Sequence, residues 1–132
     1  MRALLGVLIA GVMMAVPGLA WAEEAHEHAD EQAGAAQEQM LTGEVVDAFC
    51  YLSHGEEGLG AKHANCAKKC IKNGLPVAIR VGDQLYLATM SDHNPANQQL
   101  GEFAGRQVTV RGHVMERDGQ HLISIMSIEP SS

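Results

Sequence analysis

Three cysteines and one histidine lie close together in the sequence and have side chains that bind metal ions. They are Cys50, His63, Cys66 and Cys70. The last three have the spacing His-x2-Cys-x3-Cys, and residues at this spacing share one face of a helix with about 3.6 residues per turn. Three thiolates with one imidazole form a known structural zinc set, and thiolates also suit Cu(I). The sequence therefore predicts one zinc or copper ion per chain, either structural or carried by the domain.

The same cysteines could instead form a disulfide, because cysteines of exported proteins usually pair. A bond from Cys50 to Cys66 or Cys70 would join the first predicted strand to the helix. One thiol would remain, and a bond between Cys66 and Cys70 within one helix would have little room for disulfide geometry. The odd count and the shared helix face favour a metal site, and a disulfide-stapled binding module is the first alternative.

A redox enzyme or electron-transfer accessory protein is the second alternative. The sequence contains no Cys-x-x-Cys and no Cys-x-x-Cys-His, so neither a thioredoxin-like motif nor a c-type haem attachment is predicted. His63 could activate a neighbouring thiol, but no third residue that would orient this histidine can be chosen from the sequence. We therefore predict no catalytic residue and no enzymatic activity.

Other potential ligands flank the cluster. Asp47 precedes Cys50 by three residues and could accept a hydrogen bond from a ligand histidine, although an exposed carboxylate on a strand is the simpler expectation. His54 is expected to be solvated. His26 and His28 lie among acidic residues and could hold a divalent cation weakly, although a solubilising tail is favoured there.

Residues 1–22 have the features of a secretory signal peptide. Arg2 supplies the positive start, residues 3–16 are uncharged and almost entirely apolar, and Ala20-Trp21-Ala22 fits a cleavage site before Glu23. The apolar run is shorter than the roughly 20 residues of a membrane-spanning helix. The sequence therefore predicts export to the periplasm or secretion, with no membrane insertion after signal cleavage.

The net charge of the chain limits the classes of partner that it is expected to bind. The chain has 9 Lys and Arg against 16 Asp and Glu, and losing Arg2 with the signal would change its net charge from −7 to −8. Such a charge disfavours nucleic acid and anionic membrane surfaces and is compatible with gathering cations. The predicted partners are a metal ion and a periplasmic protein, with no nucleic acid.

After the signal, we expect a disordered acidic tail containing histidines over residues 23–39, because this stretch has no apolar periodicity. One folded domain is expected over residues 40–132. Alternating apolar residues and turn pairs predict a series of strands and helices in it. In order, they are a strand at 40–52, a glycine-rich loop at 53–60, a helix at 61–73, strands at 77–81 and 84–89, a short helix within 92–105, and strands at 107–116 and 120–128.

Five strands with a helix between the third and fourth are the order of an OB-type barrel. The fold class is therefore mainly β with two short helices (α+β), and the helix that carries the cysteines would be inserted between the first and second strands. Gly112 lies inside the fourth strand and suits the bend that a small barrel needs at a corner.

Several segments of the chain resemble small exported bacterial domains of uncharacterised function. The shared motifs are G-x-V-x-D-x-x-C (residues 43–50), H-x-x-C-A-x-x-C-I (residues 63–71) and V-x-V-x-G (residues 108–112). The resemblance covers nearly all of residues 41–128. It implies that the cysteines and His63 belong together with this fold.

Overall fold

The structure is a computed structural model and describes residues 36–131. The predicted signal peptide, His26 and His28 lie outside these residues. The elements follow in the order β1 (Gln37–Asp47), α1 (Ala48–His54), the 3-10 helix η1 (Gly55–Gly58), α2 (Gly60–Lys72), β2 (Val77–Val81), β3 (Gln84–Met90), α3 (Asn97–Gly101), β4 (Gln107–Arg117) and β5 (Gln120–Pro130).

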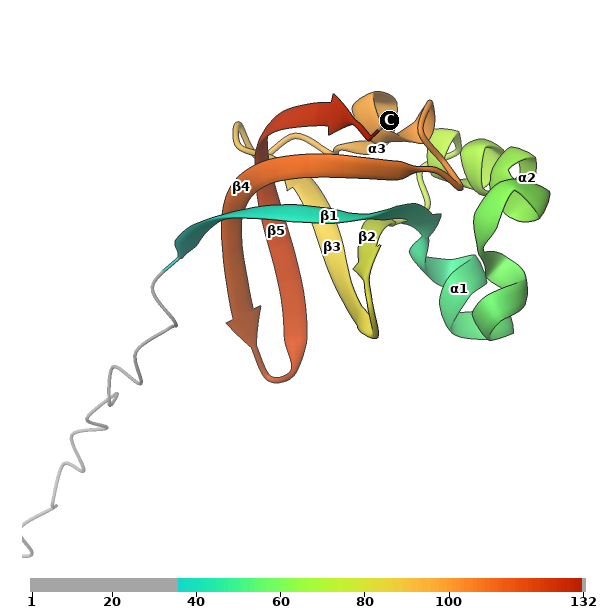
Figure 1. The fold of residues 1–132 in the computed structure, drawn as a ribbon, viewed down its shortest axis with the longest axis horizontal. Helices are drawn as coiled ribbons and strands as arrows, with labels where there is room; N and C mark the ends of the chain where they lie inside the picture. The colour runs from blue at the N-terminus through green and yellow to red at the C-terminus, as the bar shows by residue number, and fades with distance from the viewer. Residues whose placement is uncertain (1–35, 132) are drawn as a thin grey trace, which may run out of the picture.

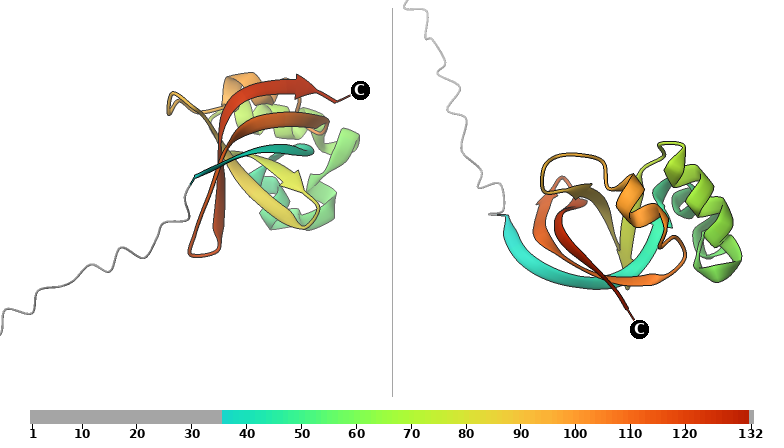
Figure 2. Two further views of the ribbon diagram at one scale, coloured as in Figure 1. Left: turned by 60° about the vertical axis from the view of Figure 1, so that its left-hand side comes forward. Right: turned by 90° about the horizontal axis from the view of Figure 1, so that it is seen from above.

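The five strands form a closed barrel in the order β1-β2-β3-β5-β4 (Figure 1). The pairing of β3 with β5 is parallel and every other neighbouring pair is antiparallel. Views from two further directions show α1 and α2 together on one side of the barrel (Figure 2). The predicted OB-like α+β barrel, with helical structure inserted between the first two strands, is confirmed.

The barrel turns a corner at Gly112. The register of β4 against β5 shifts between Arg111 and Gly112, and a side chain at Gly112 would collide with the backbone of Ser124. A residue without Cβ is therefore required at this point of β4. A register shift of this kind bends a strand, which agrees with the bend predicted at this glycine.

The core combines side chains from the strands and from two helices. The fully buried aliphatic residues include Val45, Val108 and Ile123 from the strands and Leu100 from α3. Ile71 of α2 is also completely buried and packs in the same cluster. Helix α2 is therefore part of the hydrophobic core, which fixes its position relative to the barrel.

Strand β1 ends earlier in the sequence than predicted. Residues 48–54 form α1, so the expectation that the strand continues to Leu52 is wrong, and Cys50 lies on a helix. Two of the apolar residues in this segment are exposed on α1: Phe49 is 59% accessible and Leu52 is 74% accessible. The side chain of Asp47 caps the helix, and this local interaction outweighs a weak β propensity.

Two smaller differences concern the boundaries of elements. Strand β1 begins at Gln37, three residues before the predicted start of the folded part at Met40. The short helix predicted within residues 92–105 is limited to α3, which starts after Ala96 and has no side-chain cap. The Asp92 side chain instead accepts a hydrogen bond from the backbone of Asn94 in the preceding loop. Within residues 36–131, no helix combines the length and apolar character needed to cross a membrane.

Candidate metal centre

Three of the four predicted ligands come together between α1 and α2. The sulfur atoms of Cys50, Cys66 and Cys70 all lie within 4.8 Å of one another. Sulfurs bound to one zinc ion at about 2.3 Å would be about 3.8 Å apart. Shortening the sulfur–sulfur distances by about 1 Å at most would therefore allow the three sulfurs to bind the same ion.

Helix α2 presents two of these cysteines because an adjacent face of the helix is anchored. Cys66 and Cys70 are four residues apart and share one face, as their spacing predicts. Ala67 and Ile71, the residues that follow them in sequence, are buried in the barrel core. The packing of these apolar neighbours therefore determines where the two thiols lie.

Helix α1 presents the third cysteine through one local and one tertiary hydrogen bond. The Cys50 amide donates to Oδ1 of Asp47 over 2.8 Å, and the Ala48 amide donates to the carbonyl of Pro76 over 3.0 Å. Asp47 is also opposite Val77 in the pairing of β1 with β2. The start of α1 is thus held against the segment that leaves α2.

The three thiols differ in their access to solvent. Cys50 is buried, Cys70 is half-buried and Cys66 is exposed. Burial raises the pKa of the Cys50 thiol to about 12, with further contributions from the charge of Asp47 and from Cys70. Burial and Asp47 also raise the pKa of Cys70. An ion binding here must therefore displace protons from thiols, and it can enter from the exposed side of Cys66.

His63 lies on α2 one turn before Cys66 but is not part of the group of close donor atoms. Its side chain is half-buried. The Nε2 atom of its ring is buried and has no hydrogen-bond partner. The imidazole is therefore near the cysteine cluster in sequence, and its Nε2 atom is not engaged in a hydrogen bond.

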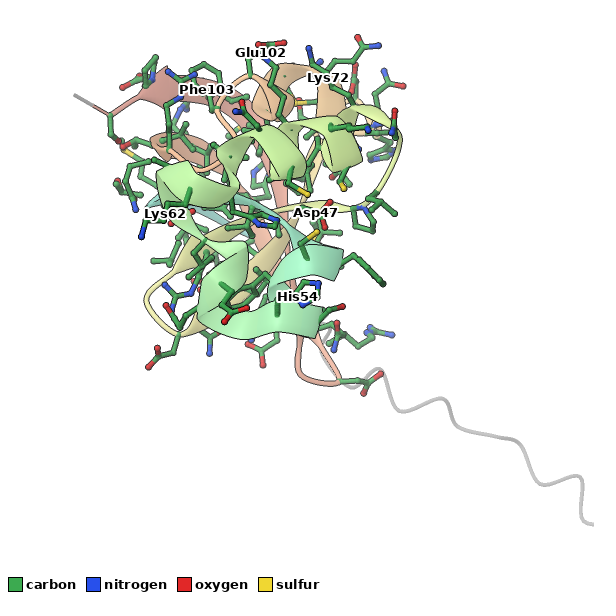
Figure 3. All side chains as sticks on the ribbon, turned by 90° about the vertical axis from the view of Figure 1, so that its right-hand side faces the viewer. Asp47, His54, Lys62, Lys72, Glu102 and Phe103 are labelled. Carbon is green, nitrogen blue, oxygen red and sulfur yellow. The ribbon has the colours of Figure 1, made fainter. Side chains whose placement is uncertain are left out.

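Asp47 is the residue at this site that sequence reasoning misjudged. We expected an exposed carboxylate on a strand, but Asp47 is completely buried and lies between α1 and α2 (Figure 3). Its Oδ1 atom caps α1, whereas its Oδ2 atom is buried without a partner. An aspartate before a short helix is a common capping residue, and that signal could have identified its role.

The remaining polar side chains around the two helices belong to the surface. His54, at the end of α1, is exposed as expected. Lys68 and Lys72 of α2 both form ion pairs with Glu102, which follows α3. These two lysines lower the pKa of Glu102 to about 2. The charges of Lys68 and Lys72 are therefore paired at the contact between α2 and α3.

An apolar cleft of about 570 Å³ also borders α1. Phe49 and Leu52 of α1 form part of its wall, together with Leu75, Leu85 and Leu87. None of the three cysteines lines it. Helix α1 thus contributes separately to the cleft and to the cysteine cluster.

Comparisons of the chain with protein-family models, with curated proteins and with solved structures give no match, so its function is inferred from the geometry of this site.

Proposed function

We propose that this protein is an exported domain that binds one zinc or copper ion through Cys50, Cys66 and Cys70. The observation that carries the proposal is the convergence of three sulfur atoms from two helices to within 4.8 Å. Thiolates are preferred ligands of zinc and of Cu(I). His63 is proposed as the fourth ligand, because its buried Nε2 atom lacks a partner and it precedes Cys66 by one helical turn.

The exposure of Cys66 supports a metal that can be exchanged. A closed site of four buried ligands would favour a purely structural ion, whereas an exposed thiol can be reached by a competing ligand. We therefore propose that the domain carries its ion or accepts it from a periplasmic protein, without an enzymatic activity of its own.

Elemental analysis of the purified, tag-free protein tests this function. We expect about one zinc or copper ion per chain, and Cys66→Ser and Cys70→Ser should each remove most of it because a thiolate ligand is lost. Asn65→Ser is the matched control: it changes an exposed neighbour on the same helix and should keep the metal. A metal-free wild-type protein that remains metal-free after anaerobic reduction and incubation with either ion would contradict the proposal.

A second control concerns the tail. His26→Ala with His28→Ala should leave the stoichiometry unchanged if the cysteines hold the ion. Loss of the metal in this double variant, with the cysteines intact, would assign binding to the tail.

A disulfide-stapled binding module remains the alternative, because sulfurs that can share an ion are also close enough to pair after a small shift. Thiol counting in denaturant, with the ion chelated and without reductant, separates the two. The metal-binding protein should yield three free thiols per chain, whereas a stapled domain should yield one. The absorbance spectrum tests the redox alternative, since haem or a Cu(II)–thiolate centre is coloured.

Export is proposed from the N-terminal sequence. When the full chain is expressed in a bacterium, the mature protein should be recovered from the periplasm or medium. Its mass should correspond to a first residue of Glu23. A cytoplasmic protein that retains residues 1–22 would contradict this part of the proposal.

A further inference from the structure

Asp47 is an unusual residue because its carboxylate is completely buried and only half satisfied. Oδ1 accepts the hydrogen bond from the Cys50 amide, and Oδ2 has no partner. Leaving a buried polar atom unpaired is costly. Among the side chains of residues 36–131, only one other buried nitrogen or oxygen lacks a partner, namely Nε2 of His63.

Both unpaired atoms belong to residues that precede a cluster cysteine by three positions. Asp47 precedes Cys50, and His63 precedes Cys66. Asp47 also lies between α1 and α2, the helices that carry the three thiols, and accepts the hydrogen bond from the Cys50 amide over 2.8 Å (Figure 3). The buried carboxylate therefore lies within electrostatic range of the cysteine cluster.

The described residues provide no cation to neutralise this carboxylate. Within residues 36–131, none of the ion pairs includes Asp47. Lys68 and Lys72 of α2 are paired with Glu102, and Arg80 of β2 is paired with Glu56. A cation bound by the cysteines would supply the missing positive charge.

We propose that Asp47 makes the cysteine site selective for a divalent ion of the zinc type over Cu(I), an inference that depends on the proposed metal-binding function. A buried negative charge beside three thiolates attracts a divalent cation more strongly than a monovalent one. Oxygen ligands and acceptors also suit zinc, whereas Cu(I) gains little from them.

Asp47 acts as a positioning residue rather than as a ligand. It is not among the donor atoms that lie within 4.8 Å of one another. Its Oδ1 atom fixes the backbone of Cys50, and its free Oδ2 atom is available to accept a hydrogen bond from His63 or from a water on the ion.

The test compares Asp47→Asn with the wild-type protein. Asparagine has the same shape and can still cap α1, but it removes the charge. The affinities for Zn(II) and for Cu(I) would be measured by competition with chelators of known affinity, anaerobically. We expect the affinity for Zn(II) to fall by about tenfold to a hundredfold and the affinity for Cu(I) to change by less than about threefold.

Two controls make the result specific. Glu56→Gln removes an exposed carboxylate elsewhere and should leave the ratio of the two affinities unchanged. Asp47→Ser also preserves a capping oxygen and should reproduce the change in the ratio. Circular dichroism of each metal-free variant establishes that it is folded.

Equal changes in both affinities, or no change, would overturn the selectivity inference while leaving the metal site intact. If both Asp47 variants fail to fold, the role of the carboxylate is structural and the inference is also overturned. A wild-type protein that binds neither ion would instead contradict the proposed function itself.

Discussion

Cys50 and Cys66 belong to one cluster but have different chemical environments. Cys50 is buried and its pKa is raised to about 12, whereas Cys66 is exposed. Only the thiolate reacts with an alkylating agent. At pH 8, a thiol with a pKa of about 12 has a thiolate fraction about a thousandfold smaller than that of a thiol with the ordinary pKa of 9.0.

The metal-free, reduced protein should therefore be alkylated by iodoacetamide at Cys66 first and at Cys50 last. The rates at individual cysteines can be followed by mass spectrometry of peptides at pH 8. In denaturant the three rates should become similar, because the burial of Cys50 is lost. Rapid labelling of Cys50 in the folded chain would contradict the environment described for it.

At the residue scale, the shared face of Cys66 and Cys70 was predictable, whereas the burial of Asp47 was not. The spacing of Cys66 and Cys70 fixes their common face wherever that segment is helical, so a local rule was sufficient. The burial of Asp47 depends on α2 and on the start of β2, which are distant in sequence. The sequence indicated that Asp47 is near Cys50, but its environment is a tertiary property.

Helix α2 has two roles at the element scale, since it carries two thiols and fills part of the core. Replacing the completely buried Ile71 by Ala removes core contacts and leaves a cavity. We expect Ile71→Ala to lower the free energy of unfolding by about 2–5 kcal/mol. Urea denaturation of the metal-free protein measures this. Lys69→Ala, at an exposed position of the same helix, is the control and should have little effect.

The contact between α2 and α3 should depend on pH through Glu102. Its pKa is lowered to about 2 by Lys68 and Lys72, whereas the unfolded chain has an ordinary carboxyl pKa. The unfolded state therefore takes up this proton first as the pH falls, so the stabilisation is present above about pH 4.5 and is lost towards pH 2.

The Glu102→Gln variant should consequently melt at a slightly lower temperature than the wild type at pH 7, and the difference should vanish near pH 2. Because the three side chains are substantially exposed, we expect a small effect that decreases in high salt. Glu57→Gln is a control at an exposed position in η1. A pH-independent difference would show that the ion pairs are not its cause.

At the scale of the whole molecule, closure of the barrel depends on the corner at Gly112. A methyl group there would collide with the backbone of Ser124, and backbone cannot rotate away as a side chain can. Gly112→Ala should destabilise the protein by about 1–3 kcal/mol or more. Thermal and urea unfolding would measure the loss, with Arg117→Ala on the same strand as an exposed control. Unchanged stability would mean that β4 tolerates a side chain at its bend.

The barrel was predictable because its signals are repeated along the chain. The turn pairs at residues 82–83 and 118–119 join the strands as expected, and the order of elements identified the OB-like topology. Helix α1 was missed, because residues 48–52 have the composition of a strand and residues 53–54 begin a predicted loop. The segment becomes helical through a cap and a tertiary hydrogen bond. Patterns spread over many residues were therefore more informative than the propensity of one short segment.

The pairing of Asp47 with Val77 brings the two ends of residues 48–76 side by side at the barrel wall. All four predicted ligands lie on this one continuous piece of chain, so it could be transplanted between the first two strands of another small barrel. A recipient would need an apolar opening that accepts Ala67 and Ile71 of α2, and an apolar surface against which Ala48 of α1 can be buried. Evolution could gain or discard such a centre in a single insertion or deletion, without redesigning the remaining strands.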